Sequence, residues 1–131
     1  MMSASITKRI LYVLLPLGLI AFQAYVEFFA PKAHLKFIGS NHLDKIPHFA
    51  AGLFIALAFG LQVAKPRLWK LLLLLAAVTL AWETYEFYFD PDMAYFYSRF
   101  PDLWRFDMAG DVTAAFLGGY GYWVFFRNRD S

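Results

Sequence analysis

Four apolar segments, each about 20 residues long, make up most of this chain. They cover residues 9–29, 46–64, 69–89 and 107–126. A helix needs about 20 mostly apolar residues to cross the hydrocarbon core of a bilayer, and each segment meets that length. The sequence therefore predicts an all-α fold, an antiparallel bundle of four transmembrane helices that forms a single integral membrane domain of residues 1–131.

The composition agrees with a lipid environment. The chain is 60% hydrophobic and only 17% charged, whereas a soluble domain usually has about a quarter of its residues charged. The net charge is only +2, without the basic runs that indicate nucleic-acid binding. The chain contains no cysteine, which excludes thiolate metal ligands and cysteine nucleophiles.

The first apolar segment resembles a secretion signal because Lys8 and Arg9 precede it. Its apolar run extends over 10–30, which is too long for a signal sequence, and no A-x-A cleavage site closes it. We expect a retained first span. The turn at Lys65-Pro66-Arg67 is short, so we expect the second and third segments to be antiparallel neighbours.

Basic residues predict the orientation in the membrane. One side holds the N-terminal flank, the 65–70 turn and the C-terminal tail, with Lys8, Arg9, Lys65, Arg67, Lys70, Arg127 and Arg129. The other side holds Lys32, Lys36, Lys45, Arg99 and Arg105. Because Lys and Arg concentrate on the cytoplasmic side, we expect a multi-pass plasma-membrane protein with both termini in the cytoplasm.

The connection 90–106 mixes aromatic and charged residues. Such rings settle at the headgroup layer, so we expect this loop to lie along the outer surface, over the polar residues described next. It would act there as a plain interfacial anchor or as a lid.

Ionisable residues recur at matching positions in the four segments. They lie at the C-terminal ends of the first and third segments and at the N-terminal ends of the second and fourth. These residues are Glu27, Asp44, His48, Glu83, Glu86, Asp107 and Asp111. In antiparallel helices all of these positions approach the same membrane face, here the extracytoplasmic one. The pattern predicts one polar site, with Glu27 left open as a member.

Stripes of small residues continue from these acids along the last three segments. They comprise Gly52, Ala56 and Gly60, then Ala76 and Thr79, then Ala115, Gly118 and Gly119. Small residues let membrane helices approach closely. The stripes should therefore face one another, and the acids should too.

Five carboxylates from the last three segments require neutralisation, because a charge at bilayer depth costs about 2.5–3.5 kcal/mol on insertion scales. We expect Asp44 and Asp107 at helix starts, where water and the helix N-terminus help them. The nearby cations, Lys45 and Arg105, are too few and are expected to point outward. Shared protons, a bound metal or a cationic substrate would supply the balance.

A divalent metal fits this set of side chains. The candidate ligands are Asp44, His48, Glu83, Glu86, Asp107 and Asp111. Oxygen ligands favour Mg²⁺, Mn²⁺ or Ca²⁺, and a mixture with histidine also allows Zn²⁺ or Fe²⁺. Each motif alone also has a structural explanation: Asp44 and His48 as a hydrogen-bonded pair, and Asp107 as a helix cap.

Three short segments in order carry a family resemblance. They are Asp44-Lys45-Ile46-Pro47-His48-Phe49, Trp82-Glu83-Thr84-Tyr85-Glu86 and Asp107-Met108-Ala109-Gly110-Asp111. These resemble the D-[KR]-x-x-H-F, W-E-x-x-E and D-x3-D motifs of one branch of the VanZ-like membrane proteins. The resemblance covers about residues 40–120. It implies a small integral protein of the bacterial inner membrane and cell envelope, and it leaves the reaction open.

Three functions are compatible with this sequence. The first is a metal-dependent enzyme that acts on a lipid or lipid-linked headgroup, with His48 or Glu83 as general base. The second is a non-catalytic membrane scaffold or partner protein whose polar cluster holds the helices together. The third is a proton- or cation-coupled carrier, which would call for a homodimer because four helices form a narrow protomer.

Overall fold

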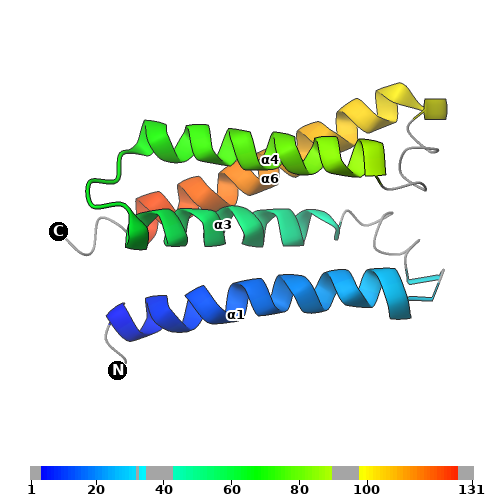
Figure 1. Ribbon diagram of the computed structural model, residues 1–131. Coiled ribbons are helices and arrows are strands. Elements are labelled where there is room, and N and C mark those ends of the chain that lie inside the picture. Colours follow the sequence, from blue (N-terminus) through cyan, green and yellow to red (C-terminus); the bar gives the residue numbers. More distant parts are fainter. Residues whose placement is uncertain (1–3, 32, 35–42, 90–97, 127–131) are drawn as a thin grey trace.

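Every regular element in the described part of the chain is helical. The computed structural model describes residues 4–31, 33–34, 43–89 and 98–126 (Figure 1). The elements are α1 (Ala4–Ala24), the π-helical turn η1 (Tyr25–Phe29), α3 (Lys45–Gln62), α4 (Leu68–Phe89) and α6 (Pro101–Phe126). The prediction of an all-α chain with four long helices is confirmed.

Three of these helices are long and apolar enough to cross a membrane. By length and composition, the spans within the described residues are Ile6–Ala24, Lys45–Gln62 and Leu68–Phe89. Helix α6 has 26 residues, which is ample length, but its glycines, tyrosines and aspartates make it less apolar. Three helices are therefore long and apolar enough to span a membrane, which is consistent with a membrane protein, and a fourth span stays a prediction.

The outer ends of the first and last helices and the α3–α4 turn lie at one end of the molecule. Figure 1 shows the N-terminal end of α1, the turn over residues 63–67 and the C-terminal end of α6 at this end. The start of α3, the end of α4 and the start of α6 lie at the opposite end. The acidic residues of the last three helices, together with His48, belong to those latter segments.

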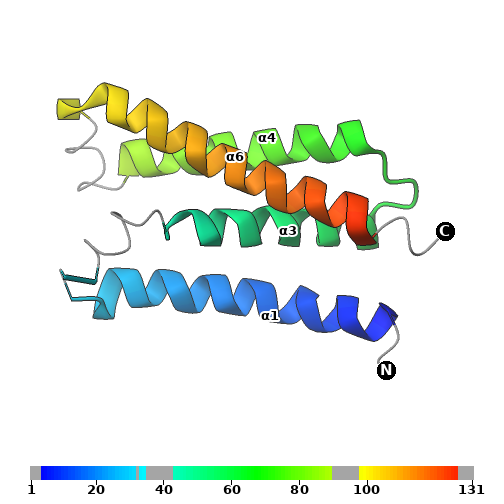
Figure 2. The same ribbon diagram turned by 180° about the vertical axis from the view of Figure 1, so that it is seen from behind.

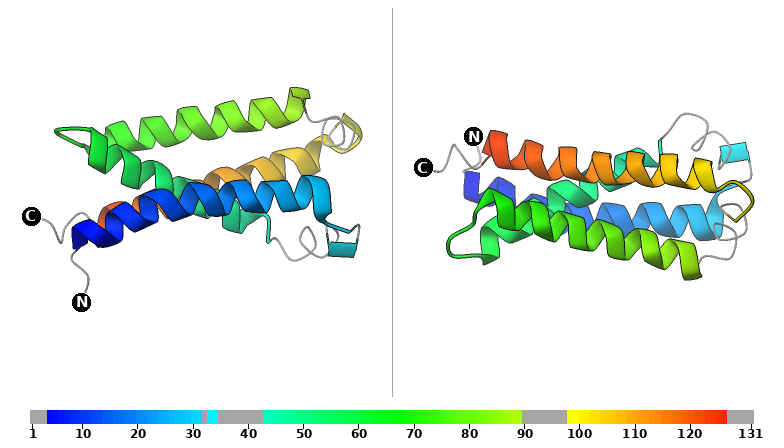
Figure 3. Two further views of the ribbon diagram at one scale, coloured as in Figure 1. Left: turned by 60° about the horizontal axis from the view of Figure 1, so that its bottom comes forward. Right: turned by 90° about the horizontal axis from the view of Figure 1, so that it is seen from above.

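Helices α3 and α6 together form the centre of the packing, and α6 lies between α3 and α4 in its contacts. Helix α6 crosses α3 obliquely, as Figure 2 shows, and the α3–α6 contact is the most extensive between elements. Helix α4 packs mainly on α6, whereas α3 and α4 diverge from the turn that joins them and contact each other little (Figure 3). The short turn joins these two helices, as predicted, but the contact between them is small.

Glycines explain why α3 pairs with α6 instead. A Cβ placed on Gly52 would lie 1.8 Å from the Ala115 carbonyl oxygen, and one on Gly118 would lie 2.0 Å from the Phe49 oxygen. No side chain fits at either point, so the two backbones touch. The predicted close approach of small-residue stripes is confirmed for these two helices.

Helix α1 lies along α3 and leaves most of its surface uncovered. Leu11, Tyr12 and Leu15 pack against the core, and the Gln62 amide donates a hydrogen bond of 3.0 Å to the Tyr12 hydroxyl. The rest of the helix exposes large apolar side chains, including Val13, Leu14, Leu17 and Ile20. An apolar surface of this kind is typical of a helix that faces lipid.

Helix α6 begins six residues earlier than predicted. The sequence prediction places residues up to 106 in a loop, but α6 starts at Pro101, with Asp102 in its first turn. Proline fits the first turn of a helix and an acidic side chain there favours the helix dipole. Asp107 thus lies in the second turn and is not a cap. Residues 90–97 of the predicted interfacial loop lie outside the described residues.

Candidate metal centre

The ammonium group of Lys45 joins three aspartates at the acidic end of the molecule. Its Nζ lies 3.0 Å from Oδ2 of Asp44, 2.5 Å from Oδ1 of Asp107 and 2.6 Å from Oδ1 of Asp111. The first partner lies at the start of α3 and the other two are on α6. The Lys45 ammonium group therefore joins α3 to α6, just beyond the point where glycines let the two backbones touch.

The expectation that Lys45 points outward is wrong. Lys45 is the first residue of α3 and its half-buried side chain turns toward α6, where Gly110 leaves room for it. A Cβ on Gly110 would lie 3.0 Å from Cε of Lys45. Three carboxylates outweigh the cost of desolvating one ammonium, which is why the side chain turns inward. Arg105, by contrast, is exposed as expected.

A second group of three side chains adjoins the first. His48 of α3, Glu83 of α4 and Asp111 of α6 each offer one ligand atom, and these atoms all lie within 4.8 Å of one another. Nε2 of His48 lies 3.4 Å from Oδ2 of Asp111. Asp111 belongs to both groups, with Oδ1 on Lys45 and Oδ2 toward His48.

Glu83 is the unusual member of this second group. Glu83 is only 5% exposed. It lies on the buried face of α4 with Leu71, Leu75 and Thr79, so its side chain points into the bundle. Within the described part of the chain, its carboxylate has no hydrogen bond or salt bridge. A buried carboxylate without a partner is costly unless a proton or a cation neutralises it.

One further buried oxygen has no partner among the described residues. Oδ1 of Asp44 is inaccessible to solvent and accepts no hydrogen bond, although Oδ2 of the same carboxylate binds Lys45. Asp44 precedes α3 at the predicted helix start, but its side chain makes no capping hydrogen bond. Its carboxylate therefore belongs to the group of aspartates around Lys45 and does not cap the helix.

The predicted residues fall into three classes by position. Five of them come together in the two groups: Asp44, His48, Glu83, Asp107 and Asp111. Glu86 lies one turn beyond Glu83, is half-buried, and belongs to neither group. The backbone of Glu27 lies in η1, and the placement of its side chain falls outside the described part.

Lys45 is the member of the cluster that the sequence analysis left out of the candidate site. The available signal was its place beside Asp44 at the start of α3, level with two acids one turn apart on α6. The glycine in Asp107-Met108-Ala109-Gly110-Asp111 was a second signal, because it provides the groove for the lysine stem.

Both groups have ligand atoms close enough together that they could hold a metal ion, and the two groups differ in their balance of charges. Asp44, Asp107 and Asp111 already surround an ammonium group. His48, Glu83 and Asp111 surround no cation of the described chain, and they present one imidazole nitrogen and two carboxylates. This ligand set suits Zn²⁺, Mn²⁺ or Fe²⁺, and its unpaired buried Glu83 fits a bound cation.

Comparisons with protein-family models, with curated proteins and with solved structures found no match to this chain. The assignment of a function therefore depends on the chemistry of the two groups.

Proposed function

We propose that the chain is a four-span membrane protein that binds one divalent cation between His48, Glu83 and Asp111. The observation that carries the proposal is the carboxylate of Glu83, a residue that is 5% exposed, which has a ligand atom within 4.8 Å of those of His48 and Asp111. Neutralisation by a divalent ion would remove the cost of burying this charge. It would also join three helices, α3, α4 and α6, at one point.

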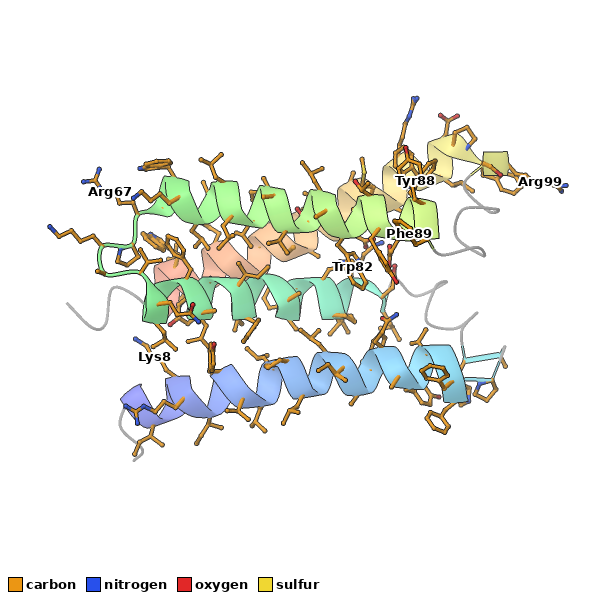
Figure 4. The ribbon with its side chains drawn as sticks, viewed as in Figure 1. Lys8, Arg67, Trp82, Tyr88, Phe89 and Arg99 are labelled. Atoms are coloured by element: carbon orange, nitrogen blue, oxygen red, sulfur yellow. The ribbon has the colours of Figure 1, made fainter. Side chains whose placement is uncertain are left out.

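The proposed membrane arrangement is an antiparallel bundle with the metal site near the extracytoplasmic face. Three apolar helices support it, as does the length of α6. Figure 4 supports it further: Lys8 and Arg67 lie at one end of the molecule, and Tyr88, Phe89 and Arg99 lie at the other. Exposed aromatic side chains at helix ends are typical of the membrane interface.

We propose enzymatic hydrolysis or transfer at a lipid or lipid-linked headgroup as the activity. Three protein ligands leave coordination positions for water and substrate, and a divalent ion acts as a Lewis acid and lowers the pKa of water. His48 and Glu83 would both lie beside the reacting atoms as ligands. The site's position near one end of the helices suits a headgroup whose acyl chains remain in the bilayer.

Metal titration of the detergent-purified protein tests the cation site. The wild-type chain is expected to bind one Mn²⁺ or Zn²⁺ after the protein has been stripped with chelator. Glu83→Gln preserves the shape and removes the charge, so it should weaken binding by about tenfold or more, the effect typical of disturbing a metal's surroundings. Glu86→Gln is the matched control and should bind as the wild type does.

Failure of the wild-type protein to bind either ion would contradict the proposal. The activity is tested by incubating the metal-loaded protein with envelope lipids and following headgroup loss by mass spectrometry. Headgroup loss should require both the ion and Glu83. Equal loss in the Glu83→Gln protein would reject the assigned catalytic site.

A structural role is the second candidate, and the Lys45 cluster is the observation that favours it. One ammonium group bound to three carboxylates on two helices would hold the bundle together without any chemistry. In that case the protein would act as a scaffold for a partner. A wild-type protein that binds neither Mn²⁺ nor Zn²⁺, and is destabilised when these acids are replaced, would favour this candidate.

Membership of the VanZ-like family remains our proposal. Its support is that the three motifs converge: Lys45 and His48 come from the first, Glu83 from the second and Asp111 from the third. The motif residues therefore form one site rather than three separate local features.

A further inference from the structure

Two adjoining groups of candidate ligands share Asp111, and among the described residues only one of the groups contains a cationic side chain. Oδ1 of Asp111 lies 2.6 Å from the Lys45 ammonium, and Oδ2 faces His48 at 3.4 Å. A carboxylate that points one oxygen into each of two cation positions is the arrangement found where two metal ions lie about 3.5–4 Å apart.

We propose that Lys45 fills the second of two adjoining cation positions with its own ammonium group, so that the site accepts a single divalent ion. Lys45 is then a positioning residue, which holds Asp111 with Oδ2 turned toward His48 and Glu83. This inference rests on the proposed cation site at His48, Glu83 and Asp111.

The hydrogen-bonding capacity of Lys45 matches the position it fills. An ammonium group has three N–H donors. The three aspartate oxygens lie at 3.0, 2.5 and 2.6 Å from Nζ, so each donor has a carboxylate acceptor. The stem lies against Gly110, where a methyl group would approach Cε to 3.0 Å. The lysine side chain is thus held along its aliphatic stem as well as at its ammonium group.

The position that Lys45 fills is suited to a metal ion when the lysine is absent. Asp44, Asp107 and Asp111 each offer an oxygen, and these oxygens lie within 4.8 Å of one another. Oδ1 of Asp44 is buried and accepts no hydrogen bond within the described residues, so it remains available as a further ligand.

Charge explains why one divalent ion suffices in the wild-type protein. The two groups together contain the carboxylates of Asp44, Asp107, Asp111 and Glu83, against the single ammonium of Lys45. One divalent ion leaves this cluster with a small negative excess. Without Lys45, two divalent ions would balance the four carboxylates.

The experiment compares Mn²⁺ binding by the wild-type protein, Lys45→Met and Lys45→Met/Asp107→Asn, all in detergent after removal of metal by chelator. Wild type should saturate at one ion per chain even with excess Mn²⁺. Lys45→Met should bind two, with an electron paramagnetic resonance spectrum of coupled Mn²⁺ ions. The double variant lacks one ligand of the second position and should return to one uncoupled ion. A merely structural lysine would change none of these spectra.

The outcomes separate this inference from the cation site on which it rests. No Mn²⁺ bound by the wild type would reject the site itself. One ion in both the wild type and a folded Lys45→Met protein would leave the site standing and overturn the inference. If circular dichroism shows that Lys45→Met does not fold, the number of Mn²⁺ ions bound by the wild-type protein is the test. A second ion bound by the wild type, with Lys45 intact, would overturn the inference.

Discussion

Asp111 and Glu83 are both buried carboxylates, at 3% and 5% exposure, and they differ in their partners. Asp111 accepts a hydrogen bond from Lys45 and faces His48, whereas Glu83 has no hydrogen bond within the described chain. The paired carboxylate stabilises the bundle without any ion. Glu83, which has no such partner among the described residues, is compensated only when a proton or a cation neutralises it.

This difference predicts opposite effects of two neutral replacements on the metal-free protein. Asp111→Asn removes a charge-assisted bond to Lys45 and should lower the free energy of unfolding by about 1–3 kcal/mol. Glu83→Gln removes an uncompensated buried charge and should leave that free energy unchanged or raise it. Thermal unfolding in detergent with chelator present measures both. A greater loss for Glu83→Gln would contradict the assignment of partners.

At the scale of the helices, the α3–α6 crossing positions the site. Gly52 and Gly118 let the two backbones touch, and Lys45 joins the same helices nearer the acidic end. Helix α4 then brings Glu83 to the pair by packing on α6. The site therefore depends on a crossing that only glycine permits.

Two glycines of α6 provide a test of this crossing. Gly118→Ala would place a Cβ 2.0 Å from the Phe49 oxygen. The helices must separate, which should lower the free energy of unfolding by about 1–3 kcal/mol and weaken metal binding. Gly121→Ala has open space around it, so it should be neutral or slightly stabilising. Equal effects of the two replacements would refute the close contact.

The sequence predicts the helices well and their pairing in part. Apolar runs indicated the segments observed as α3 and α4 to within two residues at each end. The small-residue stripes predicted that α3 and α6 approach each other, but which glycines meet depends on the geometry of the crossing. The inward turn of Lys45 was missed for a related reason. A long side chain takes its direction from neighbours on another helix, so the sequence signals for Lys45 apply only once the pairing of α3 with α6 is known.

For the whole molecule, the proposed bundle predicts which parts lie on each side of the membrane. The chain has no cysteine, so single cysteines can be introduced as reporters. Ser98→Cys, before α6, should react with a membrane-impermeant maleimide in intact spheroplasts. Lys65→Cys, in the α3–α4 turn, should react only after the membrane is opened. The reverse pattern would place the metal site on the cytoplasmic side, and labelling of both in intact cells would reject the four-span arrangement.

The central claim is that side chains from three helices meet around one divalent ion. X-ray absorption at the zinc edge of the zinc-loaded, desalted protein tests this claim most directly. The account predicts one bound zinc per chain with a single imidazole ligand and carboxylate oxygens at about 2.0–2.2 Å, and loss of the imidazole signal in His48→Ala. Zinc that is removed by desalting, or a wild-type spectrum without imidazole, would contradict it.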